Sequence, residues 1–267
     1  MTFQPVIPLT GNAGWSFLAR TRDVQETAFR SSAINQRETE YFRENIGKVT
    51  SAAELVSDRR LLSVALGAYG LDEDINNKFF IRKVLEEGTQ NDGAFANRLS
   101  DKRYFAMAKA FGFDLTPPNT VLNSFADTTI NAYLSRQFEV AVGNSDENMR
   151  LALGLERELQ GLADRGLSDT AAWFTILGTP PLRRVFELAF NIPPQAAGID
   201  VDRQFEMFRD ASNRIFGTTS PKDYLSGERQ EGLIRRFLFQ ADLAGGATSF
   251  SPGAVALSLL SAQRPLL

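Results

Sequence analysis

Four pairs of neighbouring basic residues that begin or punctuate the expected helices have a type and spacing that could do chemistry. They are Arg59-Arg60, Lys102-Arg103, Arg183-Arg184 and Arg235-Arg236. If several pairs converged, their side chains would hold a phosphate or an acidic partner through paired hydrogen bonds. In the alternative interpretation, each basic pair forms ion pairs with a nearby carboxylate such as Asp58, Asp101 or Glu187. The candidate anion-binding residues are therefore Arg59, Arg60, Lys102, Arg103, Arg183 and Arg184.

The chain contains no histidine and no cysteine. Histidine supplies most general acid–base chemistry near neutral pH and most zinc sites. This inventory excludes Ser-His-Asp hydrolases, Cys-His proteases, zinc hydrolases, common haem ligation and di-iron bundles built on Glu-x-x-His. A mechanism that uses carboxylates, lysine or tyrosine stays open.

The motifs that resemble ligand-binding sites lack residues that those sites require. Asp72-x-Asp74-x-Asn76 starts like a calcium loop, but Asn77 stands where glycine is needed and Lys83 where glutamate is needed. No glycine-rich phosphate loop of either standard type occurs. Carboxylate pairs spaced i,i+2, such as Glu38 and Glu40, point apart on a helix. We predict no catalytic residue, no metal and no cofactor.

Charge and hydropathy argue against nucleic acid and the membrane interior as partners. The net charge is −3 and the isoelectric point is near 5.3, which argues against a nucleic-acid partner, because such a surface needs a net basic face. No apolar run approaches the roughly 18 to 20 residues that cross a bilayer, and no signal peptide opens the sequence. We expect a cytoplasmic protein without membrane insertion, whose oligomeric state the sequence leaves open.

Glycine and proline divide the sequence into amphipathic stretches with helical periodicity. Ser51 with Glu54 predicts a capping box, Asp58 predicts a helix N-terminus, and Gly70 predicts the end of that helix. Strand patterns are short and interrupted. We expect the main helices at 22–46, 59–69, 72–87, 101–111, 121–142, 146–163, 170–177, 181–191, 202–216 and 227–241.

One segment of the sequence returns later in the chain. Residues 56–65 are echoed at 99–108, and each copy leads to an aromatic-Gly-apolar-Asp sequence. The irregular spacing of weaker echoes disfavours a regular solenoid. We therefore predict an all-α fold, a compact irregular multi-helix bundle built from duplicated helical hairpins. Its parts are an extended arm over 1–20, a single domain over 21–244 and a flexible tail over 245–267.

Both ends of the chain carry candidate partner-binding residues. Trp15 and Phe17 lie in the predicted arm, and the tail carries a short apolar run after a glycine-rich linker. That run could fill a groove on a partner or pack on the chain's own helices. Its candidate residues are Val255, Leu257, Leu259 and Leu260.

The sequence resembles a bacterial domain-of-unknown-function family, number twelve-seventeen in that series, found chiefly in alphaproteobacteria. The resemblance lies in the turn at 42–47, the Ser-Asp-Arg-Arg and Ser-Asp-Lys-Arg helix starts, the Ala-aromatic-Gly endings and the Ser-Gly-Glu-Arg at 226–229. It covers about residues 22–242 and includes no catalytic signature. It implies an all-helical protein, often encoded beside flagellar genes.

The leading hypothesis is a non-enzymatic helical interaction protein with an unidentified protein partner. The resemblance adds a flagellum-associated accessory or assembly role. The alternative is a small anionic-ligand binder, or an enzyme that uses arginine, tyrosine and carboxylates in a helical cavity. Convergence of Arg59, Arg103 and Arg183 in one pocket would favour it. A self-assembling structural subunit is a third hypothesis.

Overall fold

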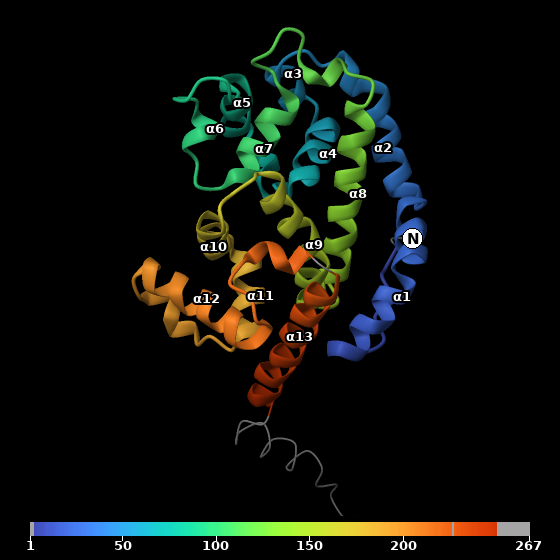
Figure 1. Ribbon diagram of the computed structural model, residues 1–267. Coiled ribbons are helices and arrows are strands. Elements are labelled where there is room, and N and C mark those ends of the chain that lie inside the picture. Colours follow the sequence, from blue (N-terminus) through green and yellow to red (C-terminus); the bar gives the residue numbers. More distant parts are fainter. Residues whose placement is uncertain (1–2, 226, 250–267) are drawn as a thin grey trace, which may run out of the picture. The chain divides into compact units, whose positions relative to one another are not determined.

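The computed structural model describes residues 3–225 and 227–249, and every regular element in them is helical. The all-α prediction is therefore confirmed (Figure 1). The chain divides into two compact units. Unit 1 comprises Met1–Pro5 and Thr21–Ala141, and unit 2 comprises Val6–Arg20 and Val142–Leu267. The single domain expected over 21–244 stays a prediction, and each unit is described by itself.

The α-helices and short 3-10 helices follow one another in the order shown in Figure 1. As far as Val121 they are α1 (Gly11–Arg30), α2 (Ala33–Asn45), η1 (Ile46–Lys48), α3 (Ala52–Ser57), α4 (Arg59–Tyr69), η2 (Asp72–Asn76), α5 (Lys78–Glu87), α6 (Phe95–Arg98), α7 (Lys102–Phe111) and η3 (Asn119–Val121). After it come α8 (Phe125–Gly143), α9 (Glu147–Asp164), α10 (Asp169–Gly178), α11 (Pro180–Phe190), η4 (Pro194–Gly198), α12 (Val201–Phe216), η5 (Pro221–Leu225) and α13 (Gly227–Ser249).

The predicted caps of α4 are confirmed. The Asp58 carboxylate accepts hydrogen bonds from the N–H groups of Arg60 and Leu61, and Gly70 ends the helix in the left-handed conformation. At α7 the Asp101 carboxylate accepts a hydrogen bond from the N–H group of Arg103, and Gly112 ends the helix in the left-handed conformation. Each echo of the repeated segment is thus a helix between an aspartate cap and a left-handed glycine, while the duplication of whole hairpins stays a prediction.

The single helix predicted over 22–46 is wrong, because the chain breaks between α1 and α2. Ser31 and Ser32 lie at the break, and Ser32 has an extended backbone. The side chain of Asn35 donates to the carbonyl of Phe29 at 2.8 Å, and the hydroxyl of Ser31 donates to Ala28. These side-chain hydrogen bonds satisfy carbonyl groups at the end of α1. The helix can therefore end here without glycine or proline.

The arm predicted to be extended over 1–20 becomes helical at Gly11. Trp15 and Leu18 lie about one turn apart, and both are buried in unit 2. The indole Nε1 of Trp15 donates to Glu231 at 3.1 Å. Burial of this apolar face outweighs the low helix propensity of Gly11 and Gly14.

Aromatic rings fill the core of unit 2. Trp173 lies edge-on to Phe186 with ring centroids 5.6 Å apart, and Phe186 lies edge-on to Tyr224 at 5.3 Å. The polar ends of these rings are also satisfied: Trp173 donates to the carbonyl of Thr219, and the Tyr224 hydroxyl pairs with Ser212. The cluster joins α10, α11, α12 and η5.

Helix α13 is longer than the predicted range 227–241 and continues to Ser249. It packs on α11, where Arg236 Nε donates to the carbonyl of Ala189 at 2.5 Å. The rest of the predicted flexible tail, residues 250–267, lies outside the described residues. Among the helices in the described part of the chain, none is long and apolar enough to cross a membrane.

We expect the two left-handed glycines Gly11 and Gly217 to differ in their tolerance of alanine. A Cβ on residue 11 would collide with the Asp242 carboxylate, whereas one on residue 217 would meet nothing within 4 Å. Gly217→Ala therefore carries only backbone strain of about 1 to 2 kcal/mol. Gly11→Ala adds to a similar strain the cost of displacing the Asp242 carboxylate, so its loss should be larger. Urea unfolding followed by circular dichroism measures both, and equal losses would contradict the contact between Gly11 and Asp242.

Candidate interaction surface

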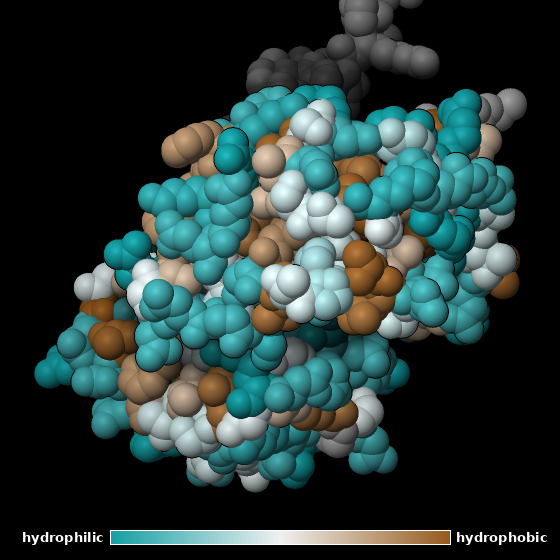
Figure 2. All heavy atoms as spheres, turned by 90° about the horizontal axis from the view of Figure 1, so that it is seen from above, coloured by the Kyte–Doolittle hydropathy of each residue, from teal (hydrophilic) through white to brown (hydrophobic). Residues whose placement is uncertain are grey.

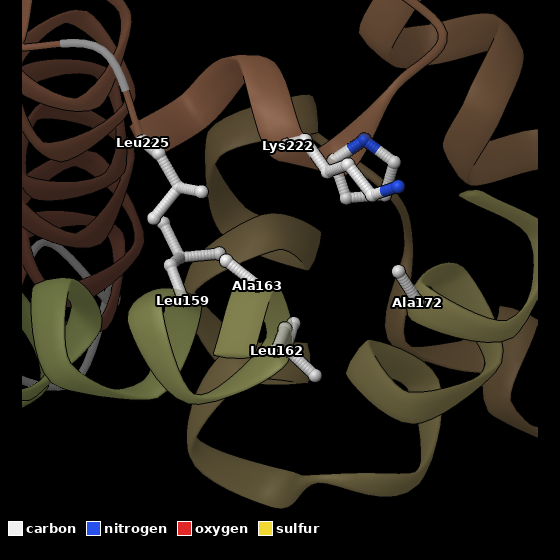
Figure 3. Close-up of a pocket in the computed structure, with 7 residues that line it drawn as sticks. Leu159, Leu162, Ala163, Ala172, Lys222 and Leu225 are labelled. Atoms are coloured by element: carbon white, nitrogen blue, oxygen red, sulfur yellow. The ribbon is translucent and has the colours of Figure 1, made fainter. Parts of the chain in front are cut away.

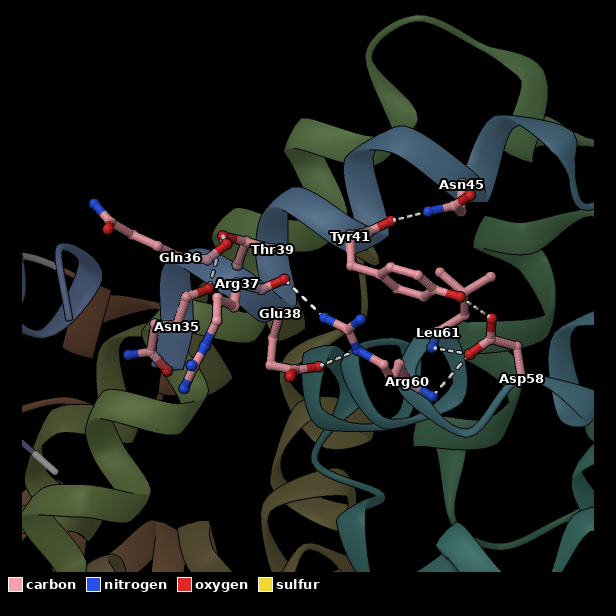
Figure 4. A network of polar contacts seen from close by, with 10 residues as sticks. All are labelled: Asn35, Gln36, Arg37, Glu38, Thr39, Tyr41, Asn45, Asp58, Arg60 and Leu61. Carbon is pink, nitrogen blue, oxygen red and sulfur yellow. Dashed lines mark hydrogen bonds and ion pairs between the residues drawn. The ribbon is translucent and has the colours of Figure 1, made fainter. Parts of the chain in front are cut away.

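Arg60 is a clamp between α2 and α4 (Figure 4). Its Nε donates to Glu38 at 3.3 Å, and its Nη2 donates to the carbonyl of Arg37 at 3.0 Å. The guanidinium also lies over the ring of Tyr41, 3.8 Å from the ring centroid. This candidate anion-binding side chain is therefore used to hold two helices together.

Asp58 and Tyr41 form the other half of this network (Figure 4). The Tyr41 hydroxyl donates to Asp58 Oδ2 at 2.6 Å, while Oδ1 accepts the two N–H groups of the helix cap. Burial acts to raise the pKa of Asp58, but the hydrogen bonds from Tyr41, Leu61 and Arg60 together lower it below its ordinary value. The carboxylate is thus tuned to stay charged as a cap.

The neighbouring Arg59 and the basic pair of α7 also make local contacts. Arg59 Nη1 donates to Asn76 at 3.2 Å. Lys102 Nζ donates to the carbonyl of Leu99 at 2.8 Å. These contacts tie the first turn of each helix to the segment beside it.

Arg103 contacts Asp101 and Gly70 in unit 1. Its Nη2 lies 2.7 Å from Asp101 Oδ2, and its Nη1 donates to the carbonyl of Gly70 at the end of α4. The guanidinium thus links the N-terminus of α7 to the C-terminus of α4. The ion pair with Asp101 is the one that the alternative interpretation of the basic pairs expected.

Arg183 and Arg184 belong to unit 2. Arg183 Nε lies 2.6 Å from Glu187, and its Nη1 donates to the carbonyl of Leu177. Arg184 is exposed. Each of the other described candidates makes its own local contacts, and anion binding by these residues stays a prediction.

Every tyrosine of the chain has a raised pKa. Burial is the first cause for Tyr69, Tyr133 and Tyr224, whose pKa values it raises to about 12. Burial also raises the pKa of Tyr104, helped by its hydrogen bond to Asp74. For Tyr41 the hydrogen bond to Asp58 comes first. These phenols stay protonated near neutral pH, so they are poor general bases.

A cavity in unit 2 lies between α9, α10 and η5 (Figure 3). Leu159, Leu162 and Ala172 line it, with Lys222 at its edge. Its volume is about 10 Å³, which corresponds to roughly one water molecule. It is too small for a metabolite. In the described part of the chain, no group of three or more acidic side chains is placed to hold a metal ion.

The structure describes one of the two groups of candidate partner-binding residues. Trp15 is only 8% exposed and is used inside unit 2, and Phe17 is half-buried. The tail candidates lie outside the described residues, so their role stays a prediction. They are Val255, Leu257, Leu259 and Leu260.

Helix α13 has apolar side chains on two opposite faces. Phe237 and Leu238 lie in the core, with exposed fractions of 0% and 1%. Phe239 and Leu243, one turn apart, are 53% and 54% exposed. A pair spaced i,i+4 shares one helix face, so these two side chains form an outward apolar stripe.

The segment before α1 also carries an exposed apolar side chain. Leu9 is 55% exposed, and Gly11, two residues later, lies against Asp242 of α13. Phe239 and Leu243 form the α13 apolar surface. In contrast, the face shown in Figure 2 carries its hydrophobic atoms in small groups among hydrophilic ones, which is ordinary for a protein surface.

Sequence reasoning missed the α13 apolar surface, although the sequence carries a signal for it. At ~100° per residue, Phe239 and Leu243 project about opposite to Ile234 and Ala241, which also lie on this helix. Apolar residues therefore surround the helix instead of forming one stripe. The expectation of a helix that ended at Ala241 left Leu243 outside it and hid this pattern.

Comparisons with known proteins agree with the fold. A family model described as "Protein of unknown function (DUF1217)" matches residues 68–223, more than half of the chain. An X-ray crystal structure of a protein from Agrobacterium tumefaciens superimposes with a TM-score of 0.71 at 28% identity. The match covers 90% of this chain and 99% of the Agrobacterium chain. A comparison with curated proteins found no match. Phe239 and Leu243 lie beyond the residues that the family model matches.

We predict that Asp58 stabilises the protein in a pH-dependent way. Its folded pKa lies below its ordinary value, so its contribution is present above about pH 4 and is lost as pH falls through the folded pKa. Asp58→Asn keeps a capping oxygen but does not titrate. The stability advantage of wild type over this variant should shrink between about pH 6 and about pH 3, as measured by urea unfolding.

Tyr41→Phe provides the control for this effect. It removes the hydroxyl that donates to Asp58. In this background, the pH dependence of the stability difference between aspartate and asparagine at position 58 should therefore become smaller. If aspartate at position 58 stabilised the protein over asparagine by the same amount at about pH 6 and about pH 3, the lowered pKa of Asp58 would be contradicted.

We expect alanine substitutions on the two faces of α13 to differ in their effect on the free energy of unfolding. Phe237→Ala empties a core position and should cost about 3 to 5 kcal/mol of unfolding free energy. Phe239→Ala removes an outward ring and should change it by no more than about 0.5 kcal/mol. Urea unfolding of both variants tests the assignment. A large loss for Phe239→Ala would show that this ring is part of the core.

Proposed function

We propose that this chain, which belongs to the DUF1217 family of proteins of unknown function, is a non-enzymatic helical protein that binds a protein partner through the α13 apolar surface. The observation that carries this proposal is the outward stripe of Phe239 and Leu243, each more than half exposed on a well-anchored helix. A rigid helix face with apolar anchors at i and i+4 suits recognition by a complementary groove or helix.

The anchoring of α13 supports the proposal. Leu233, Phe237 and Leu238 bury the inner face of the helix, and Trp15 ties it to α1 through Glu231. The outward side chains are therefore presented in fixed directions, which lowers the conformational entropy lost when a partner binds. Burial of a half-exposed phenylalanine and leucine on binding would supply about 1 kcal/mol or more each.

The chemistry of the chain disfavours the alternative of an enzyme or small-ligand binder. Histidine and cysteine are missing from the sequence, and the tyrosines have raised pKa values. The cavity of unit 2 holds about one water molecule. Arg59 and Arg103 make contacts with their own neighbours, Asn76 and Asp101. These observations support binding of a macromolecule over catalysis.

A flagellar accessory or assembly role is the more specific form of this proposal. It rests on the gene neighbourhood that the family resemblance implies, and the α13 apolar surface is compatible with any protein partner. The proposed partner is therefore defined by its chemistry, as a protein with a complementary apolar surface.

Cross-linking in living cells of the native host, followed by mass spectrometry, tests the proposal. Wild-type protein and the double variant Phe239→Asp/Leu243→Asp are compared, because two carboxylates on this stripe oppose apolar contact. We expect one recurrent partner with wild type and its loss with the double variant. With the purified partner, calorimetry should show at least about a tenfold weaker affinity.

Phe79→Asp is the matched control, because Phe79 is 82% exposed on α5 of unit 1. This variant adds a charge to an outward phenylalanine outside the α13 apolar surface and should retain the partner. Equal recovery of the same partner by the double variant and wild type would overturn the proposal.

A further inference from the structure

Helix α5 of unit 1 carries a phenylalanine that the fold leaves exposed. The inner face of α5 packs on α3, α6 and α7 (Figure 1) and buries Ile81, Val84 and Leu85. Phe79 is 82% exposed, and it shares the outward face with residues three, four and seven positions later. We call the exposed residues on this side of the helix the α5 outer face. They are Lys78, Phe79, Arg82, Lys83, Glu86 and Glu87.

The charges of the α5 outer face change sign along the helix. Lys78, Arg82 and Lys83 occupy the first half, and the last turn carries Glu86 and Glu87. Arg82 Nε lies 2.6 Å from Glu86, and Lys83 Nζ lies 3.8 Å from Glu87. A basic residue four positions before an acidic one is the less favourable order, because positive charges then lie near the positive end of the helix dipole. This order therefore stabilises α5 less than the reverse order would.

The carboxylates that precede α5 belong to η2, and two of the three have partners of their own. Asp72 accepts a hydrogen bond from Gln137 at 2.6 Å. Asp74 accepts one from the hydroxyl of Tyr104. The third, Glu73, is exposed. The first half of the α5 outer face thus presents more positive charge than its surroundings compensate.

We infer that the α5 outer face is a contact between two copies of this chain, which pair their α5 helices antiparallel. In this arrangement Arg82 and Lys83 of each copy meet the acidic last turn of the other. The positive N-terminal end of each helix also lies beside the negative C-terminal end of the other. A two-fold contact needs a surface that is complementary to itself, and a face that changes sign along its length has this property.

Phe79 supplies the apolar part of this contact. The other residues of the face except Lys78 line, together with Phe79, an open hollow of about 400 Å³. In the antiparallel pair, each Phe79 lies beside the last turn of the other α5 and covers the aliphatic carbons of its charged side chains. Burial of the two rings favours association, while the charges fix the orientation of the helices.

The charge pattern favours a second copy over other partners. A nucleic acid or an anionic membrane would meet the carboxylates of Glu86 and Glu87, whereas a second copy meets opposite charges at both ends of the helix. Isolated exposed ion pairs contribute little, but several charges in one network contribute more. The contact is short, because ten residues of helix span about 15 Å. We therefore expect a weak dimer that is sensitive to salt.

This inference does not depend on the proposed function. Helix α5 belongs to unit 1 and the α13 apolar surface to unit 2. The α5 outer face binds a second copy of the chain, whereas the α13 apolar surface is assigned to a different protein. Failure of either experiment leaves the other proposal standing.

Sedimentation equilibrium of the full chain tests whether the dimer forms. Between about 1 μM and about 1 mM protein, we expect a dimer whose fraction rises with concentration. This fraction should fall as sodium chloride is raised from about 0.02 M to about 1 M, because salt screens exposed charges. A monomer throughout the concentration range at low salt would overturn the inference.

Charge reversal tests whether the α5 outer face makes the contact. Arg82→Glu/Lys83→Glu makes the face acidic. Glu86→Lys makes it mainly basic and retains Glu87, whose Oε2 accepts the N–H of Phe95. Each variant alone should dimerise at least about tenfold more weakly than wild type, because like charges meet. A mixture of the two, with one labelled by a fluorescent dye, should recover association as a mixed dimer.

Two phenylalanine variants complete the comparison. Phe79→Ala should weaken the dimer at least about tenfold, whereas Phe239→Ala, which removes an exposed ring from α13, should leave it unchanged. A dimer that persists in Phe79→Ala and in both charge-reversed variants would show that another surface associates, and would overturn the inference. Failure of the mixture to associate would also overturn it. Circular dichroism spectra establish that all variants fold.

Discussion

The packing of α13 against α11 is the interaction on which the rest of unit 2 depends. It is the most extensive helix contact in that unit, and it buries Leu233, Phe237 and Leu238. Because side chains on a helix have fixed directions, burial of one face determines what the opposite face presents. Packing of the inner face of α13 therefore determines that Phe239 and Leu243 point outward.

Helix ends are the part of the fold that could be predicted from the sequence. Asp58 and Gly70 act through bonds to residues at most a few positions away, so local sequence determines them. The break at Ser31 and Ser32 was missed because side-chain hydrogen bonds, with neither glycine nor proline, produce it. The helix at Gly11 was missed because its stability comes from Trp15 packing inside unit 2, a tertiary contact.

The basic pairs show why a sequence pattern cannot distinguish a binding site from a structural contact. Arg60 and Arg103 have the forked geometry that suits an anion, but a carboxylate and a backbone carbonyl of the protein already occupy that geometry. Asp58 and Asp101, which precede the two pairs, cap the helices from which the arginines project. The repeated Ser-Asp-basic-basic segment thus starts a helix and ties it to a neighbour.

The pKa values of the titratable side chains and the composition of α13 bear on the proposed function separately. General acid–base chemistry without histidine or cysteine uses a tyrosine, lysine or carboxylate whose pKa is shifted toward neutrality. Among the described carboxylates, burial raises the pKa of Asp242. The tyrosines are shifted away from neutrality, by burial or by hydrogen bonds to carboxylates. Structural roles therefore account for their raised pKa values, whereas no contact within the described core requires Phe239 and Leu243 to face outward as apolar side chains. A serine or glutamate at either position would leave the buried face of α13 unchanged, which is why the proposed function assigns these two apolar side chains to contact with a partner.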